Sequence, residues 1–266
     1  MRQRKARGKV AVLGPEGTFT ETAAKKMFEE PALEYKDNVE EVFKYADSGK
    51  GTGVVAIENS LEGSVTKTLE ALMEYDVKIC GETTIEINLC LIKKPETKEI
   101  KAVLSHPHAL AQCKNYIKNR YSKARLQPTD STVAAIKELR GTENAAAIGP
   151  KQAAEKYGLE IAEENIQDDK SQTRFVAISR EECSGKKTSL IYSLKDEPGA
   201  LYDTLKVFAE KNINLTKIES RPSRKKLGEY VFYVDFENNG LDKQETKKLL
   251  EKIREKTTFM KYLGSY

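Results

Sequence analysis

The chain contains 266 residues, of which 39% are hydrophobic and 32% are charged, and its 45 basic and 41 acidic side chains leave a net charge of +4. This length predicts two domains or three small ones, and the composition excludes a fully disordered chain. No apolar run approaches the ~20 residues that a membrane helix needs. The spread, nearly balanced charge argues against nucleic acid as the main partner.

The four cysteines, at positions 80, 90, 113 and 183, form no CxxC pair and have no histidine at zinc-binding spacing. We therefore expect reduced structural thiols in a cytoplasmic protein, and no metal site. The basic segment 1–9 is not followed by an apolar region. We interpret this segment as a solvated tail rather than as a secretory signal.

Short apolar runs alternate with amphipathic segments in the first part of the chain. KVAVL (9–13) and VVAI (54–57) are typical of buried strands. Helices are expected over 18–30, from a cap at Asp37-Asn38 to about residue 47, and over about 65–75.

The same order of strands and helices is repeated after Lys101, with low sequence identity between the two stretches. KAVL (101–104) and AAAI (145–148) predict buried strands, and helices are expected from about Pro107, from the cap 130–132 to about 139, and after Gly149-Pro150. Alternating strands and helices indicate an α/β fold with parallel sheets. We expect two lobes facing each other across a cleft, with ligands at the carboxyl ends of the strands.

Two further apolar runs are expected to join the lobes. IEINLCLI (85–92) can cross as one long strand, and TRFVAIS (173–179) can return. Two crossings predict a hinged, two-lobed binding fold over 9–184, of the kind seen in periplasmic binding proteins, and this analogy does not by itself give function. We place lobe 1 at about 9–85 plus 173–184, and lobe 2 at about 86–172.

The pattern changes after the segment 184–187, which we interpret as a linker. The order strand, helix, strand, strand, helix, strand predicts a ferredoxin-like α+β domain over 187–266. Two helices are expected on one face of its sheet, and the other face is expected to be open or paired with another copy. The expected strands are 188–194, 215–220, 229–237 and 259–263, with helices after Pro198-Gly199 and over 243–256.

Six motifs, in order along the chain, carry a resemblance to a known family. They are GPEGTFTE (14–21), AIENSLEGSV (56–65), SHPHALAQC (105–113), TRF (173–175), GALYDTL (199–205) and ESRP (219–222). The chain resembles the monofunctional prephenate dehydratases over nearly its whole length after residue 9, and its C-terminal part resembles an ACT domain, a small-molecule regulatory module. One departure is His108, where many relatives carry Gln.

The resemblance implies conversion of prephenate to phenylpyruvate, water and carbon dioxide, with feedback inhibition by phenylalanine. It also implies a homodimer or homotetramer formed through the ACT and catalytic domains. Because the reaction makes the ring aromatic, the protein needs to orient the substrate and assist the departure of hydroxide. No metal, flavin or nucleotide cofactor is required, and the turn 14–18 has neither the P-loop ending nor dinucleotide-binding glycine spacing.

Thr173 is the catalytic residue that the resemblance implies, through a hydrogen bond at the leaving hydroxyl. A threonine hydroxyl is a poor proton source unless a neighbour relays the proton, so we expect a donor rather than a free acid. An ordinary strand threonine is the alternative. Arg174 can bind a substrate carboxylate, although strand neighbours point to opposite faces. Phe175 packs either near the substrate ring or in the core.

Further candidates for substrate binding lie at strand ends and helix starts. Hydroxyl and amide groups can bind carboxylates, and helix N-termini attract anions. Thr18 and Ser64 are also good N-caps, and His106 can act either in acid–base chemistry or as a structural hydrogen-bond partner. Glu58 is a candidate proton relay or a structural partner. The expected substrate-binding residues are Thr18, Asn59, Ser60, Gly63, Ser64, His106, Arg174 and Phe175.

Two motifs of the ACT-like part form the expected phenylalanine site. Gly199 permits a tight turn and a close backbone approach to a ligand, although plain turn chemistry would explain both motifs as well. In the resembling family the two motifs meet across a dimer interface. The expected effector residues are Gly199, Ala200, Leu201, Asn212, Asn214, Glu219, Ser220, Arg221 and Pro222.

Two other functions stay open at this point. One is a binding or sensor protein that uses the same cleft without chemistry. The other is an arogenate dehydratase, whose substrate has an amine where prephenate has a keto group.

Overall fold

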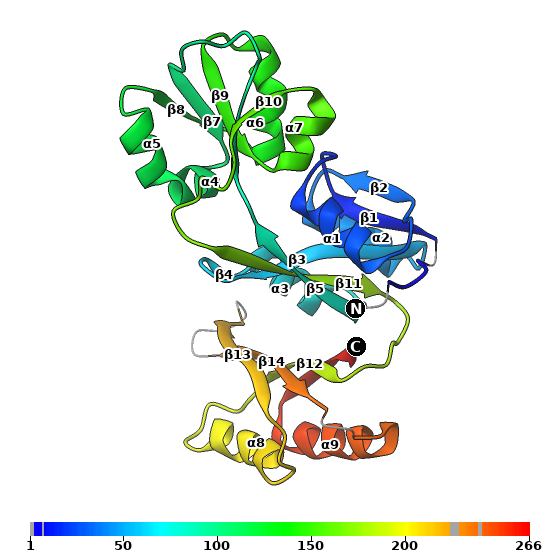
Figure 1. Ribbon diagram of the computed structural model, residues 1–266. Coiled ribbons are helices and arrows are strands. Elements are labelled where there is room, and N and C mark those ends of the chain that lie inside the picture. Colours follow the sequence, from blue (N-terminus) through cyan, green and yellow to red (C-terminus); the bar gives the residue numbers. More distant parts are fainter. Residues whose placement is uncertain (1–2, 7, 224–228, 239–240) are drawn as a thin grey trace.

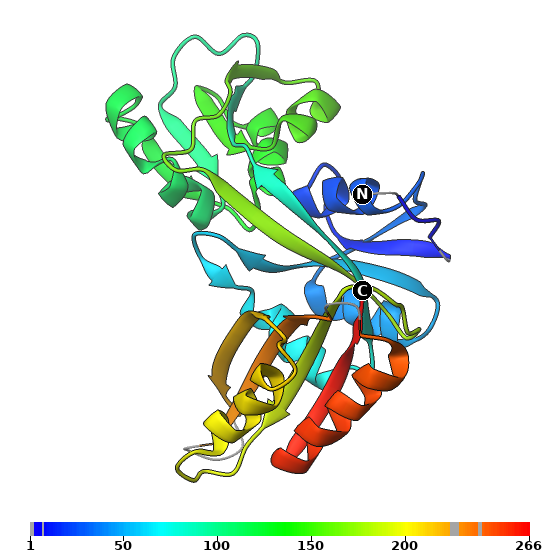
Figure 2. The ribbon, with the colours of Figure 1, turned by 60° about the horizontal axis from the view of Figure 1, so that its bottom comes forward.

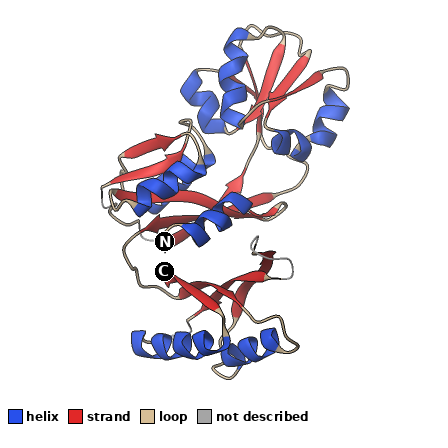
Figure 3. Cartoon of the chain, turned by 180° about the vertical axis from the view of Figure 1, so that it is seen from behind, coloured by secondary structure: helices blue, strands red, loops and turns tan. Residues whose placement is uncertain are grey.

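The computed structural model describes residues 3–6, 8–223, 229–238 and 241–266, which form three β-sheets with their helices (Figures 1 and 3). Figure 1 shows the sheet of the middle segment at the top, the sheet of the N-terminal part below it, and the C-terminal sheet at the bottom. Among the helices so described, none is long and apolar enough to cross a membrane.

The first sheet has the strand order β2-β1-β3-β11-β5, with β4 paired to β3. Its strands are β1 (Lys9–Leu13), β2 (Leu33–Lys36), β3 (Gly51–Asn59), β4 (Gly63–Ser64), β5 (Lys78–Ile87) and β11 (Ser171–Ser179), and its helices are α1 (Phe19–Met27), α2 (Val39–Asp47) and α3 (Thr66–Glu74). β1 runs parallel to β2 and β3, whereas β11 runs antiparallel to β3 and β5. The expectation of parallel sheets is therefore wrong for β11, because this strand returns from the second lobe.

The second sheet has the order β10-β6-β9-β7-β8. Its strands are β6 (Cys90–Lys93), β7 (Ala102–Ser105), β8 (Arg125–Pro128), β9 (Ala145–Gly149) and β10 (Glu160–Glu163), and its helices are α4 (Pro107–Gln112), α5 (Lys114–Arg120), α6 (Thr132–Glu138), the short 3₁₀ helix η1 (Leu139–Gly141) and α7 (Lys151–Tyr157). β7 is parallel to β8 and β9, while β6 is antiparallel to β9 and β10. This sheet is also mixed, because β6 enters from the first lobe.

The crossing segment 85–92 forms two strands and not the expected single one. β5 ends at Ile87 and β6 begins at Cys90. Leu89 lies in the break, where its N–H donates to the Gln167 side chain at 2.9 Å and its carbonyl accepts from the N–H of Ile166 at 3.0 Å. The chain must leave one hydrogen-bond ladder before it enters the other, and the returning segment satisfies its backbone at that point. Figure 2 shows the paired connections β5 and β11 running side by side.

The third sheet has the order β13-β14-β12-β15. Its strands are β12 (Lys187–Ser193), β13 (Leu215–Pro222), β14 (Tyr230–Glu237) and β15 (Phe259–Ser265), with the helices α8 (Ala200–Ala209) and α9 (Lys243–Lys256). One face packs against the two helices through residues such as Phe208, Phe236 and Leu249. This is the expected ferredoxin-like arrangement.

The other face of the third sheet packs against the first lobe, so it is not the open face that the sequence allowed. Ile191, Val231 and Leu263 pack there in one apolar cluster with Ile57 and Leu69 of the first lobe. The hydroxyl of Tyr233 also donates to the carbonyl of Leu69 at 3.1 Å. Burial of this apolar surface against the first lobe supplies a driving force for the contact between the two domains.

The segment 184–187, expected to be a linker, is fastened to the C-terminus. The Gly185 carbonyl accepts from the Asn238 side chain at 2.9 Å, and the N–H of Lys187 donates to the carbonyl of Tyr266 at 3.1 Å. A Cβ at position 185 would lie 1.7 Å from the carbonyl carbon of Tyr266. Glycine is therefore required here by the close approach of the two backbones.

Candidate active site

The side chains of Asn59 and Thr173 meet where β3 pairs with β11. The Asn59 Nδ2 atom donates to Thr173 Oγ1 at 2.9 Å and to Ser171 Oγ at 2.9 Å. The Asn59 Oδ1 atom accepts from the N–H groups of Leu61 and Glu62 at 2.9 and 3.1 Å. The amide is therefore oriented at both ends, and it presents an N–H to the threonine hydroxyl.

A β-bulge brings this pair together. Glu58 and Asn59 pair with Arg174 and Thr173, but Ala56 already pairs with Phe175, so Ile57 has no partner on β11. The extra residue reverses the alternation of side chains along β3. Ile57 consequently packs toward the C-terminal sheet, while Asn59 turns to the opposite face, where Thr173 lies.

Ser60 extends the pairing of β3 and β11 by one residue. Its N–H donates to the carbonyl of Gln172 at 2.9 Å, and its Oγ atom accepts from the N–H of Gln172 at 3.0 Å. Because a hydroxyl both donates and accepts, the proton of Ser60 can still be offered to a ligand.

The turn after Asn59 is held by the second lobe. Glu62 accepts from Gln112 of α4 at 3.2 Å and pairs with His108 Nδ1 at 2.5 Å. His108, the one visible departure from the family motif, is therefore a contact between the lobes.

His106 caps α4 with its ring. Its Nδ1 atom accepts from the N–H of His108 at 3.3 Å, and the two rings stack with centroids 5.0 Å apart. Burial lowers the pKa of His106, and the neighbouring His108 lowers it further. The ring is therefore neutral near pH 7, and the accepting Nδ1 assigns its proton to Nε2, which makes it a donor.

Thr18 is the N-cap of α1. Its hydroxyl accepts from the N–H of Glu21 at 3.3 Å and donates to the carbonyl of Leu13 at 3.2 Å. The proton of this hydroxyl is used within the chain, so the structure supports the capping alternative for Thr18.

Arg174 does not join the Asn59–Thr173 pair, which corrects the expectation that it lines a substrate site. Its guanidinium lies 2.7 Å from Asp235 of β14, 3.0 Å from Glu82 and 3.4 Å from Glu58, and its side chain is only 14% exposed. Burial alone would lower the pKa of Arg174, but Asp235 raises it, so the residue stays cationic. Phe175 is buried in the core of the first lobe, in agreement with the core-packing alternative.

Ser64 does not cap α3, contrary to the capping alternative. The N-cap position is Val65, which has no side chain able to accept such a bond. Ser64 instead donates to Glu219 of β13 and accepts from Lys217 Nζ at 2.5 Å. The preceding Gly63 has a φ of +77°, which glycine adopts without strain.

The expected effector residues are divided between two places. Gly199 is the left-handed N-cap of α8, followed by Ala200 and by Leu201, which is 36% exposed. Glu219 and Arg221 face the first lobe instead, where Arg221 donates to Thr66 at 2.9 Å. Asn212 and Asn214 lie in the α8–β13 connection, and Ser220 and Pro222 alternate with Glu219 and Arg221 along β13. Within the residues described, no hydrogen bond or ion pair joins the two motifs.

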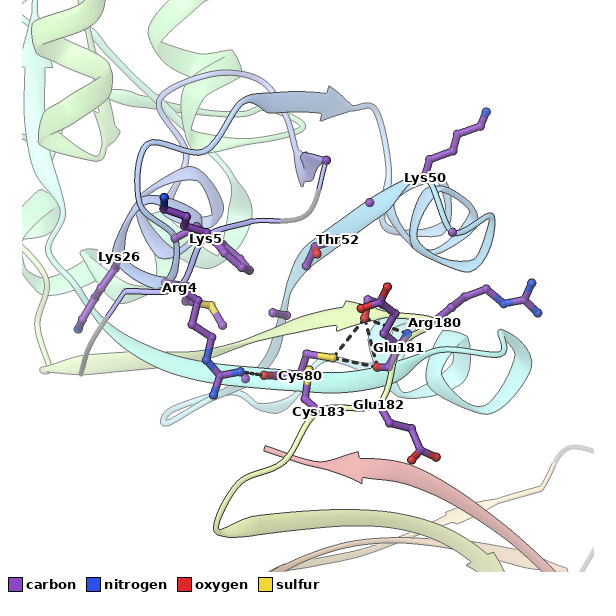
Figure 4. Close-up of a pocket in the computed structure, with 18 residues that line it drawn as sticks. Arg4, Lys5, Lys26, Lys50, Thr52, Cys80, Arg180, Glu181, Glu182 and Cys183 are labelled. Carbon is purple, nitrogen blue, oxygen red and sulfur yellow. Dashed lines mark hydrogen bonds between the residues drawn. The ribbon is translucent and has the colours of Figure 1, made fainter.

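A cavity of about 550 Å³ lies elsewhere, where N-terminal residues cover the first sheet (Figure 4). Arg4, Lys26, Cys80 and Cys183 are among its lining residues, and none of the expected substrate residues lines it. Burial, followed by the interaction with Cys183, raises the pKa of the Cys80 thiol to about 12. We therefore do not assign the catalytic site to this cavity.

Ser171, which accepts from Asn59, and Lys217, which contacts Glu58 and Ser64, were not among the sequence candidates. Ser171 lies two residues before Thr173, and the alternation along a strand indicates that both face the same way. Lys217, Glu219 and Arg221 alternate along β13, a pattern that predicts one charged strand face. In the part of the chain that the structure describes, no group of three His, Cys, Asp or Glu side chains could hold a metal ion.

The fold and the site define a two-lobed α/β protein with an attached ferredoxin-like domain, whose candidate site offers amide, hydroxyl and imidazole groups. The family model for prephenate dehydratase matches residues 10–183, and that for the ACT domain matches residues 188–254. The chain therefore belongs to the prephenate dehydratase family.

Individual relatives agree with this assignment over nearly the full chain. The prephenate dehydratase of Methanocaldococcus jannaschii is 44% identical over 265 residues, which cover 95% of each protein. The crystal structure of prephenate dehydratase in complex with L-Phe from Arthrobacter aurescens has a TM-score of 0.87 at 31% identity and covers 96% of this chain and 89% of that chain. The prephenate dehydratase structure from Staphylococcus aureus has a TM-score of 0.82 at 30% identity and covers 97% and 99%.

Proposed function

We propose that this protein converts prephenate to phenylpyruvate, water and carbon dioxide, with residues 9–184 carrying catalysis. The observation that carries this proposal is the hydrogen bond from Asn59 to Thr173. It occupies a lone pair of the threonine oxygen, so the hydroxyl proton is left to donate. Thr173 then stabilises the departing 4-hydroxyl as negative charge develops on it, while the substrate loses carbon dioxide and becomes aromatic.

Two neutral donors, Ser60 next to this pair and His106 at the start of α4 in the second lobe, support a role in substrate binding. The Ser60 hydroxyl and the Nε2–H of His106 both retain a proton that the described contacts do not use. In the proposed complex they orient the carboxylates of prephenate between the lobes. Gly63 and Ser64 act through the geometry of the turn. Arg174 is held by carboxylates of the protein, so it does not serve as the carboxylate anchor.

We propose that residues 187–266 form the regulatory domain, which binds phenylalanine and lowers the activity. The relative from Arthrobacter aurescens, whose structure is a complex with L-Phe, supports this effector. Because no hydrogen bond or ion pair joins Gly199–Leu201 to Glu219–Pro222 in the residues described, a complete site would combine motifs from two copies in a homodimer or homotetramer. The four free thiols support a cytoplasmic location.

One assay tests the catalytic proposal and its alternatives. The purified full chain would be given prephenate and arogenate separately, and formation of phenylpyruvate and of phenylalanine would be followed by absorbance and chromatography. We expect turnover of prephenate, and loss of turnover in Thr173→Ala. Turnover of arogenate alone would reassign the substrate, and binding of prephenate without turnover would favour a sensor.

A further inference from the structure

The strand pair that carries Thr173 has a second face, which lies toward the C-terminal domain. Asn59 pairs with Thr173 and Glu58 pairs with Arg174. Adjacent strand residues point to opposite faces, so the Asn59–Thr173 pair lies on one side of the sheet and Glu58 and Arg174 lie on the other. The side with Glu58 and Arg174 faces the C-terminal sheet, as the ion pair between Arg174 and Asp235 shows.

Lys217 of β13 is the centre of the contacts on this side. Its Nζ atom lies 3.0 Å from Glu58 Oε1, 2.5 Å from Ser64 Oγ and 3.3 Å from Glu219 Oε2, and its side chain is 10% exposed. An ammonium group has three protons to donate, and each has a partner here. Lys217 therefore fixes both ends of the segment 58–64, which contains Asn59.

The same segment is held from its other side by the second lobe through Glu62, His108 and Gln112. Figure 1 shows β4, the end of this segment, between α4 above and β13 below. The segment thus joins all three sheets. β13 therefore contacts the segment that carries Asn59 directly, through Glu58 and Ser64.

We propose that Lys217 is a positioning residue, which holds Glu58 and Ser64 so that Asn59 remains on the Thr173 hydroxyl, and that the effector acts by withdrawing Glu219 from this cluster. This inference rests on the proposed function and specifies the route of its regulation. The ammonium of a bound amino acid competes with Ser64 and Lys217 for the Glu219 carboxylate. Once Glu219 turns to the ligand, its contacts with Ser64 and Lys217 are lost, and the segment 58–64 is held less firmly. The effector therefore binds better to the state in which Asn59 is displaced from Thr173.

The test uses the full chain with Lys217→Met, which keeps the length of the side chain and removes its charge. We expect kcat to fall about 10-fold with KM changed less than about 3-fold, because a positioning contact is lost and not a substrate contact. Saturating phenylalanine should lower the remaining rate less than about 2-fold, although calorimetry still detects its binding, since the coupling between the sites is lost.

Two further variants separate this role from a structural one. Lys217→Arg should restore both turnover and inhibition in part. Lys206→Met removes an equivalent charge from α8, where Lys206 is half-exposed and lies 3.9 Å from Glu210, and it should behave as wild type. If Lys217→Met unfolds, Lys217→Gln gives the same comparison.

The proposal would be overturned if phenylalanine inhibited the Lys217→Met protein as strongly as wild type. It would also be overturned if the variant no longer bound phenylalanine, because Lys217 would then belong to the effector site. A wild-type chain that turns over neither prephenate nor arogenate would instead refute the proposed function, so the two failures are distinguishable.

Discussion

The guanidinium of Arg174 lies 2.7 Å from the carboxylate of Asp235, a side chain that is 7% exposed. The residue next to the proposed catalytic threonine is thus bound to the C-terminal domain. Ser189 also donates to Asp235 at 2.6 Å, and Lys187 lies 2.5 Å from Glu82, which pairs with Arg174. The link between the two domains is therefore a connected network of charges.

Replacement of Arg174 by glutamine should destabilise the protein by about 3–5 kcal/mol, because it leaves the Asp235 carboxylate buried without a cation. Urea unfolding of the full chain measures this loss. Arg180→Gln is the matched control, since Arg180 is 52% exposed and pairs with Asp47 and Asp76, and its removal should cost under about 1 kcal/mol. A strong rise in the KM for prephenate with an unchanged free energy of unfolding would instead show that Arg174 binds the substrate.

Thr173→Ala should lower kcat by about 10²-fold or more, the scale for loss of one transition-state donor. Thr173→Ser should keep part of the activity, because the hydroxyl remains while the methyl group that restricts its rotamer is lost. Ser171→Ala leaves the Asn59–Thr173 bond in place and should cost less than Thr173→Ala. Steady-state kinetics with circular dichroism of each variant checks this order, and wild-type turnover in Thr173→Ala would contradict the assignment.

His106 should make the stability of the protein depend on pH. Because burial lowers its pKa in the folded state, the unfolded chain binds more protons than the folded one just below the unperturbed pKa of ~6.5. The free energy of unfolding should therefore rise with pH in that window and level off above it. Urea unfolding of wild type and His106→Asn between about pH 5 and 8 measures the difference, and identical slopes would show that His106 is not perturbed.

Gly185→Ala should destabilise the protein by about 3 kcal/mol, the upper part of the range for overpacking, because its Cβ would overlap the backbone of Tyr266. Gly141→Ala is the matched control, since a Cβ there meets nothing within 4 Å and the backbone does not require glycine. Thermal unfolding of both variants tests this. Equal effects would mean that the segment 184–187 is not tightly fastened to the C-terminus.

The sequence by itself determined the order and kind of most elements, and the motifs that identify the family. Apolar runs and capping residues such as Asn38 and Ser131 act on neighbouring residues only. The strands and helices that they produce can therefore be predicted without knowledge of the tertiary structure. Among the strands that the patterns do not predict are β2, β8 and β10, and these three are all sheet edges. An edge strand is paired on one side only and has a weaker apolar pattern, as the mixed burial of these three shows.

The tertiary structure alone decided which groups face each other. Strict alternation along β3 would place Ile57 and Asn59 on one face, and only the bulge at Ile57, visible in the pairing with a strand more than 100 positions away, puts Asn59 on Thr173. Likewise, no local pattern shows that Arg174 would meet Asp235, or that Ser64 would meet Lys217 and Glu219. The partner of a side chain across an interface depends on how distant segments pack together. The periodicity of the local sequence shows only which residues of one strand or helix share a face.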